Sequence, residues 1–149
     1  MSIEEPTVWG IHASKTGDAD TLFRTHSVIA LGWHKIGDLT GLPEDREAFK
    51  RRMADAFPQM KEGAIPVNAG QLFRFTHEAA LGDVVAYPSK RDRQICLGHI
   101  TGEYQYRPDL EPTYPHQRSV EWVREVPRSQ FSQGALYEIG SAMSFFQIK

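Results

Sequence analysis

Two hydrophobic periodicities alternate along the chain, and the first half begins with strand-like segments. Residues 7–13, TVWGIHA, alternate between two faces and predict a strand. Residues 28–31, VIAL, form a short apolar run that predicts a second, buried strand, after which Gly32 is expected to let the backbone turn. Trp33 therefore lies at a strand end, where its indole either caps the core through a bonded N–H group or faces a binding site.

Helical patterns occur in three segments. A short helix is expected shortly after residue 18, with Asp18 as its N-cap. In residues 39–58 the apolar side chains fall on one face, and Pro43 suits the first helical position ahead of acidic and then basic residues. A further apolar stripe predicts a helix over residues 67–77. Both longer helices are interpreted as packing elements.

The second half returns to strand-like patterns. Strands are predicted at residues 83–87, 95–101, 119–126 and 144–149, and a helix or turn at 128–140. Strands and helices do not alternate regularly, so a doubly wound fold fits poorly. The sequence predicts one mixed α/β or α+β domain over residues 1–149, built on a curved sheet or small β-barrel of about six strands flanked by helices.

The composition narrows the functional classes. The chain has 149 residues, a net charge of −2 and one cysteine, Cys96, which lies in an apolar run. The acidic balance argues against coating nucleic acid non-specifically, and a single cysteine cannot form an internal disulfide. No apolar run approaches the roughly 18 residues of a membrane span, and the first residues are acidic where a signal peptide is basic. A cytoplasmic protein is therefore expected.

Motifs for catalysis or metal binding are missing from the sequence. It contains no HExxH motif, CxxC pair, G-x-S-x-G elbow, Walker loop or G-x-G-x-x-G motif. Its six histidines are scattered rather than set at ligand spacings. We therefore expect a protein that is not an enzyme and that needs no metal and no cofactor.

Aromatic and basic side chains gather in the long segment between the predicted strands 95–101 and 119–126. They are Tyr104, Tyr106 and Tyr114, interleaved with Arg107, His116 and Arg118. Such rings can stack on a nucleobase while cations hold its phosphates, or the tyrosines can pack under the loop as a small satellite cluster. A second basic group, Lys90, Arg91 and Arg93, lies either at a solvated hairpin tip or along a binding edge.

The order of four segments resembles a known superfamily. VWGIHAS, VIALGW, GDVVAYPSKRDRQICLGHITGEYQY and HQRSVEWVREVPRSQF follow one another and cover nearly the whole chain. They resemble the EVE and YTH branch of the PUA-like superfamily, which has a tryptophan near the end of the second strand and G-D-x-V, G-x-I-T and V-x-W strands. GWHKIGDLTGL, NAGQLFRF and YPHQRSVEWV are also similar to the amino-terminal domain that precedes the nuclease domain of Mrr-like restriction endonucleases.

The resemblance implies a role for each candidate residue. EVE and YTH domains flip a base that bears a methyl or related group into an aromatic cage, so Trp33 would be one wall and the three tyrosines candidates for the others. Ser14 would contact the base edge, and Asn68 and Gln71 would line the pocket, unless they only cap a helix or bond a loop. The nucleic-acid backbone would be held by Lys15, Lys90, Arg91, Arg93, Arg107, His116 and Arg118. His34 follows Trp33 where YTH domains have serine, so the base-edge contacts depart from the YTH pattern.

The sequence therefore predicts a PUA-like module that reads a methylated or otherwise modified DNA base by flipping it, as the targeting domain of a restriction system. The nuclease domain would come from a longer parent protein or from a partner, and no membrane partner is expected. Two alternatives stay open. One is an RNA-binding PUA-like module, and the other is a structural or protein-interaction domain that buries Trp33 and the tyrosines and binds no nucleic acid.

Overall fold

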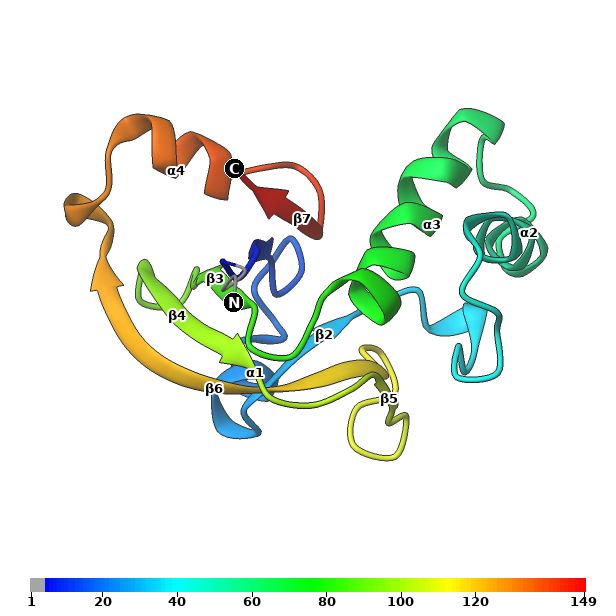
Figure 1. Ribbon diagram of the computed structural model, residues 1–149, viewed down its shortest axis with the longest axis horizontal. Coiled ribbons are helices and arrows are strands. Elements are labelled where there is room, and N and C mark those ends of the chain that lie inside the picture. Colours follow the sequence, from blue (N-terminus) through cyan, green and yellow to red (C-terminus); the bar gives the residue numbers. More distant parts are fainter. Residues whose placement is uncertain (1–4) are drawn as a thin grey trace, which may run out of the picture.

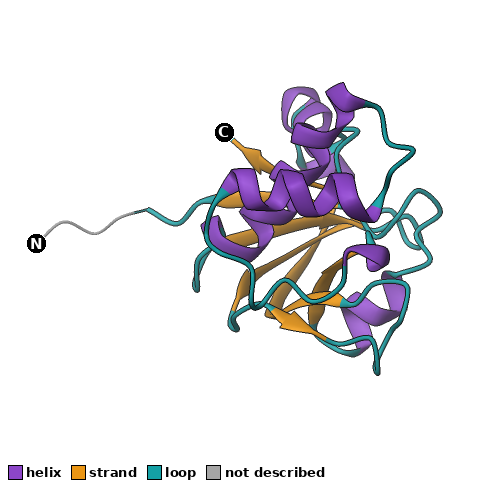
Figure 2. Ribbon diagram, turned by 90° about the vertical axis from the view of Figure 1, so that its right-hand side faces the viewer, coloured by secondary structure: helices purple, strands orange, loops and turns teal. Residues whose placement is uncertain are grey.

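The computed structural model describes residues 5–149, which form a curled sheet with four helices placed around it (Figure 1). The elements are β1 (Val8–Ile11), α1 (Asp20–Thr25), β2 (Val28–Leu31), α2 (Arg46–Ala56), α3 (Ile65–Phe73), β3 (Val84–Pro88), β4 (Gln94–Ile100), β5 (Gln105–Tyr106), β6 (His116–Pro127), α4 (Gln133–Ile139) and β7 (Phe145–Ile148). Figure 2, a side view, shows helices in front of and above the strands. The predicted α+β fold with a curved sheet flanked by helices is confirmed.

The strands follow the order β2-β6-β4-β3-β1-β7, and the short β5 pairs with β6 outside this path. β1 and β3 run parallel, whereas the other neighbours are antiparallel. β6 pairs first with β2 and then with β4, and Figure 1 shows its long curve. A register shift lies between Leu97 and Gly98 of β4, where a Cβ atom on Gly98 would stand 2.5 Å from the Glu121 carbonyl oxygen. Only glycine permits this close approach, which helps the sheet to curl.

The core lies between the sheet and the helices. Alternation within β1 buries Trp9 and Ile11, and all four residues of β2 are buried. Trp9 stacks on Phe145 of β7 with 4.8 Å between the ring centroids, and its indole N–H donates to Asp83 at 2.9 Å. These contacts fix β1 between β3 and β7, and they set the position of residues 12–15, which leave the end of β1.

α2 and α3 pack against each other at one side of the sheet, on the right of Figure 1. Phe49 of α2 and Phe73 of α3 meet edge to face, with 5.3 Å between their ring centroids. α2 begins later than the predicted start at Pro43, because Asp45 is the N-cap and accepts the Glu47 N–H at 3.1 Å. A carboxylate that satisfies a free N–H group fixes the helix start more firmly than a proline that only suits the first turn.

Two local predictions differ from the structure. Asp18 does not cap α1, which begins two residues later without a side-chain cap; the Asp18 carboxylate accepts hydrogen bonds from Ser14 and Tyr114 instead. The turn after β2 is made by Trp33 itself, whose φ is +52°, and not by Gly32. A left-handed backbone costs a residue other than glycine on the order of 1 kcal/mol, so the surrounding structure must hold Trp33 in place.

Candidate functional site

A cavity of about 240 Å³, which we call the slot, lies where the loop after β1, the end of β2 and the segment before β6 meet. Its lining combines the aromatic Trp33 and Tyr114 with the polar Ser14 and Lys15. The rest of the wall consists of His12, Ala13, Ala19, Ala30, Leu31, Gly32 and Ser144. Small-molecule sites usually span roughly 300–1,000 Å³, so the slot suits a single flat ring better than a large ligand.

The Trp33 indole is held at the slot by its polar edge. Its N–H group donates to Asn68 Oδ1 at 3.2 Å, and Asn68 in turn donates to the Ala64 carbonyl at 2.8 Å. Trp33 belongs to no aromatic pair within residues 5–149, whereas Trp9 stacks on Phe145. A half-buried indole with a fixed edge and no stacked partner offers a ring face to a ligand.

Tyr114 is fixed at the slot by Asp18. Its hydroxyl donates to Asp18 Oδ1 at 2.7 Å, and the Ser14 hydroxyl donates to the same oxygen. These hydrogen bonds, that from Ser14 first, lower the pKa of Asp18, so the carboxylate is ionised at neutral pH. Burial and the Asp18 contact raise the pKa of Tyr114. The backbone of Gly32 lies beside the ring, because a Cβ atom there would stand 3.9 Å from two Tyr114 ring atoms.

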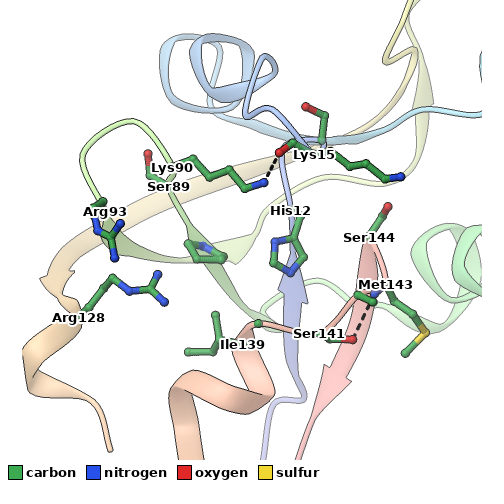
Figure 3. A pocket seen from close by; sticks show the side chains of 14 residues that line it. His12, Lys15, Ser89, Lys90, Arg93, Arg128, Ile139, Ser141, Met143 and Ser144 are labelled. Atoms are coloured by element: carbon green, nitrogen blue, oxygen red, sulfur yellow. Dashed lines mark hydrogen bonds between the residues drawn. The ribbon is translucent and has the colours of Figure 1, made fainter. Parts of the chain in front are cut away.

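A second cavity of about 780 Å³ adjoins the slot, and His12, Ser14, Lys15 and Ser144 line both. It also receives cationic side chains from two distant segments, which are Lys90 and Arg93 in the β3–β4 turn and Arg128 after β6 (Figure 3). The remaining lining is Pro88, Ser89, Ile139, Gly140, Ser141, Ala142 and Met143. We call this the basic cavity, since no carboxylate side chain from residues 5–149 lines it.

The charges of the basic cavity are not neutralised by acidic partners. Lys15, Lys90, Arg93 and Arg128 form no salt bridge within the described part of the chain. Lys90 donates to the backbone carbonyl of Lys15, which links the two loops. Burial, together with the nearby Lys90, lowers the pKa of His12. A concave surface with unpaired positive charge attracts anions.

Backbone strain gathers at the two cavities. Four residues other than glycine have positive φ within residues 5–149, namely Ser14 (+74°), Ser27 (+51°), Trp33 (+52°) and Arg93 (+62°). All of them except Ser27 line the slot or the basic cavity. Because each such residue costs on the order of 1 kcal/mol, they persist where the surrounding structure holds them, and they cluster at functional sites.

Tyr104 and His116 form an interior relay instead of a cage wall. The Leu39 N–H donates to the Tyr104 hydroxyl at 3.3 Å, that hydroxyl lies 2.7 Å from His116 Nδ1, and His116 Nε2 lies 3.3 Å from the Trp33 carbonyl oxygen. Burial lowers the pKa of His116 to about 4, so the ring is neutral at neutral pH. The network assigns its proton to Nε2, where it donates to Trp33. The relay therefore supports the left-handed turn at Trp33 through the hydrogen bond from His116 to the Trp33 carbonyl oxygen.

Arg118 is an interior clamp. Its side chain donates to the carbonyl groups of Gly102 at 2.9 Å, Phe75 at 3.1 Å and Ala79, and the residue is 1% exposed. His116, two residues earlier on the same face of β6, is fully buried. Neither side chain reaches the surface, so the prediction that both hold a nucleic-acid backbone is wrong.

Asn68 and Gln71 stand behind the cavity walls and do not line either cavity. They lie one turn apart on α3, where Asn68 holds the Trp33 indole. Gln71 is buried, and its Oε1 accepts the N–H groups of Ser144 at 2.8 Å and Phe145 at 3.1 Å. Asn68 and Gln71 were expected to contact a base directly. In the structure they instead hold two residues of the cavity walls, Trp33 and Ser144.

Three other predicted residues lie away from both cavities. Tyr106 packs against the His116 ring with 5.7 Å between centroids. Arg91 Nη1 lies 3.9 Å from Asp20 Oδ2, and Arg107 pairs with Asp109 at 3.1 Å. The predicted residues that the structure does bring together at the slot and the basic cavity are Trp33, Tyr114, Ser14, Lys15, Lys90 and Arg93.

Sequence reasoning did not single out His12, Arg128 or Ser144, and it assigned Asp18 to a helix cap. A local signal existed only for Asp18, because Ser14 followed four residues later by an aspartate suits a turn closed by side-chain hydrogen bonds. The Ser14 hydroxyl indeed accepts the N–H groups of Gly17 and Asp18 at 3.1 and 3.2 Å. The other three residues meet only through the tertiary fold.

The arrangement suits non-covalent binding of a flat ring beside an anion. Residues 5–149 contain no group of three or more His, Cys, Asp or Glu side chains placed to hold a metal ion. Burial raises the pKa of the Cys96 thiol to about 11, which makes it a poor nucleophile. In the same part of the chain, no helix has the length and apolar character needed to cross a membrane.

Comparison with known protein families covers most of the chain. The model of a protein family described as "Domain of unknown function (DUF8426)" matches residues 9–149. No curated protein matches the chain. The matched region includes every residue that lines the slot and the basic cavity.

Proposed function

We propose that this chain, which belongs to the DUF8426 family, is a nucleic-acid-binding module that reads a modified base in the slot beside Trp33. The observation that carries the proposal is the convergence of Trp33, Tyr114, Ser14 and Lys15 on one small cavity. These residues come from three separate segments, and each belongs to the set expected from the resemblance to PUA-like EVE and YTH domains.

The slot supplies the interactions that a flipped base needs. Unstacking a base costs a few kcal/mol, and an aromatic contact returns about 1–3 kcal/mol per stacked base. A methyl group on the base adds about 0.8 kcal/mol when it is buried against apolar side chains such as Ala30 and Leu31. The ionised Asp18, which does not itself line the slot, keeps the Tyr114 ring in position through the hydrogen bond from its hydroxyl. Methyl burial alone corresponds to about fourfold discrimination, and the void or water that an unmodified base would leave beside Ala30 and Leu31 extends it to about 10-fold to 100-fold.

The charge distribution supports binding in which the base dominates. A net charge of −2 gives weak affinity for unmodified duplex, while the basic cavity keeps positive charge beside the slot. The module itself performs no reaction in this proposal. It acts in the cytoplasm and directs a nuclease, carried by a longer parent protein or a partner, to modified DNA, as the resemblance to Mrr-like enzymes implies.

The test is fluorescence-anisotropy binding to matched DNA duplexes that carry adenine, N6-methyladenine, cytosine, 5-methylcytosine or 5-hydroxymethylcytosine at one position. One modified duplex should bind about 10-fold to 100-fold more tightly, and Trp33→Ala should remove that preference. Trp33→Phe keeps a ring but loses the bond to Asn68, so its preference should be intermediate. The control is Tyr137→Ala, because Tyr137 is 86% exposed and lines neither cavity.

Equal binding of all duplexes, or a preference that survives in a folded Trp33→Ala variant, would exclude base reading by the slot. RNA strands of the same sequence provide the comparison with the RNA-binding alternative. No binding to any of these nucleic acids would instead favour a structural or interaction domain.

A further inference from the structure

We propose that the basic cavity holds the phosphate group attached to the nucleotide whose base occupies the slot. The pairing of base and phosphate rests on the proposed function, whereas the phosphate site itself stands on the basic cavity alone. The ligand would then be bound in two compartments, with its ring beside Trp33 and its phosphate among Lys90, Arg93 and Arg128.

The first support is a local charge that opposes the charge of the whole chain. The chain carries a net charge of −2, yet Lys15, Lys90, Arg93 and Arg128 line the basic cavity without a carboxylate among the lining residues of the described chain. Most surface cations of a folded protein have water or an acidic neighbour beside them. Four cations around one concave surface focus a positive potential, which an anion relieves.

The second support is the approach of two guanidinium groups from distant segments. Arg93 lies in the β3–β4 turn, Arg128 follows the end of β6, and Figure 3 shows both side chains reaching into the cavity from the same side. Neither forms a salt bridge within residues 5–149. Arginine forks match the oxygens of a phosphate in pairs, so this geometry favours a phosphate over a simple halide.

The third support is the backbone at Arg93, which has a φ of +62° at the end of the β3–β4 turn. Glycine or asparagine is the usual residue at such a position. An arginine there accepts a strained backbone while its side chain lines the basic cavity. The turn thus places a charged side chain at the basic cavity at a position that glycine would fit with less strain.

The fourth support is the wall that the two cavities share. His12 projects from the end of β1 into the middle of the view in Figure 3, and its Nε2 is buried without a hydrogen-bond partner in the described structure. The Nε2 atom has almost no exposed surface, and the His12 ring stacks on Phe146 with 5.5 Å between the ring centroids, so His12 forms part of the shared wall and fixes its position. Lys15 and Ser144 flank it on the shared wall, which is where the sugar between base and phosphate would cross.

Two sources supply this chemistry, namely a nucleic-acid strand and a free nucleotide. Both carry a phosphate attached to the sugar of the bound base. A strand continues beyond the cavity and meets further cations, whereas a free nucleotide is complete within the two compartments. The experiment therefore compares both forms of the same nucleotide.

The decisive variants are Arg93→Gln, Arg128→Gln and the double variant, each in the full chain. Arg91→Gln is the matched control, because Arg91 lies in the same turn as Arg93, carries the same charge and does not line the basic cavity. Calorimetric titration with inorganic tripolyphosphate at low salt measures the phosphate site without any base. Each single variant should weaken binding about tenfold, and Arg91→Gln should leave it within about twofold.

The second arm measures the duplex that carries the preferred modified base, the corresponding nucleoside and its 5′-monophosphate. The monophosphate should bind about tenfold more tightly than the nucleoside, and the double variant should abolish that difference. With the duplex, the double variant should reduce the slope of log affinity against log salt by about 2. A duplex that binds more tightly than the monophosphate identifies a strand as the ligand, and equal affinities identify a free nucleotide.

Failures of the two proposals give different results. If the double variant binds tripolyphosphate as the wild type does, or if Arg91→Gln weakens binding equally, the phosphate site is excluded. If tripolyphosphate binding depends on Arg93 and Arg128 while Trp33→Ala leaves all duplex affinities unchanged, the phosphate site stands and base reading by the slot fails. A circular-dichroism melt confirms that each variant is folded before its affinity is interpreted.

Discussion

Two groups of residues around β6 have similar composition but opposite surroundings. The interior group, Tyr104, His116 and Arg118, uses its polar groups in hydrogen bonds within the protein. The cavity group, Tyr114 and Arg128, lines the slot and the basic cavity. Aromatic and cationic side chains therefore do not by themselves mark a binding surface. A binding surface also needs side chains that a ligand can reach and polar groups that are not already used in hydrogen bonds within the protein.

Strand register explains why the interior group faces inward. β6 pairs with β2 so that His116 lies opposite Leu31 and Arg118 lies opposite Ile29. Directly opposed residues in neighbouring strands point to the same face of a sheet. Because Leu31 and Ile29 belong to the core, their cross-strand partners are carried into the core as well. Arg118 is then tolerated there because three carbonyl groups accept hydrogen bonds from its Nε and Nη1 groups.

The largest expected effect is on stability, from removal of the interior clamp. Arg118→Met should lower the free energy of unfolding by about 3–5 kcal/mol, because three buried carbonyl groups lose their donor. Urea unfolding followed by tryptophan fluorescence measures the change. Arg107→Met is the control, since Arg107 is exposed and pairs only with Asp109 within the described chain, and it should unfold like the wild type. Equal urea midpoints for Arg118→Met and the wild type would show that the Arg118 hydrogen bonds do not stabilise the fold.

The interior relay should also make stability depend on pH. The folded protein binds a proton at His116 only near pH 4, whereas the unfolded chain binds it near pH 6.5, so acidification between these values favours unfolding. The His116 contribution is fully present above about pH 6.5 and is lost as pH falls to about 4, a loss of roughly 3 kcal/mol. Urea midpoints measured between pH 7.5 and 4 trace this loss.

His116→Gln is the control for the pH profile. The variant should be less stable at pH 7 but should lose less stability on acidification, and the remaining slope belongs partly to His12, whose pKa burial also lowers. Parallel profiles for the variant and the wild type would show that His116 is not the group that titrates. The slot should keep its base preference at pH 7 in the wild type, because the relay is intact there.

The sequence was sufficient for most of the fold because the fold depends on periodicity. Alternation in residues 7–13 and the apolar run 28–31 predicted β1 and β2, and the helical spacing near Phe49 predicted α2. The predicted helix start was wrong where a single hydrogen bond fixes it: α2 was expected to begin at Pro43, but the Asp45 cap places its start later. Local patterns record which face is apolar, but the position of a cap depends on a single side-chain contact.

The site was only partly predictable, because it depends on long-range register. Trp33 and Tyr114 were expected together and do meet, but nothing local separates Tyr114 from Tyr104. Arg128 follows a strand end that reads as an ordinary turn, and it reaches the basic cavity only after β6 has curved across the sheet. The left-handed backbone of Trp33 is invisible in the sequence, since the preceding Gly32 is the more obvious turn residue.

A matched pair of tyrosine variants sharpens the comparison between the two groups. Tyr104→Phe leaves the Leu39 N–H and His116 Nδ1 without their partner and should cost about 1–2 kcal/mol of stability, with little change in base affinity. Tyr114→Phe loses only the bond to Asp18 and should cost less than about 1 kcal/mol, while affinity for the preferred duplex falls several-fold because the ring is no longer fixed. Urea unfolding and anisotropy together separate the two. The reverse pattern, with Tyr104 controlling affinity, would place the cage wall in the interior group.

The smallest expected effect is a gain in stability at the strained Arg93. Arg93→Gly removes the cost of a left-handed backbone, which is on the order of 1 kcal/mol, but it also adds freedom to the unfolded chain, so the net gain is about 0.5 kcal/mol. Arg93→Ala removes the same charge and keeps the strain, and it should show no gain. Both variants should weaken tripolyphosphate binding about tenfold, because both lose one guanidinium of the basic cavity. If only Arg93→Gly is more stable than the wild type and both variants lose the same tripolyphosphate affinity, then the arginine lowers stability at this position while its charge increases phosphate affinity. Equal stability of the two variants would show that the turn accommodates a side chain without strain, whereas an equal loss of tripolyphosphate binding would still show that the Arg93 charge contributes to the phosphate site.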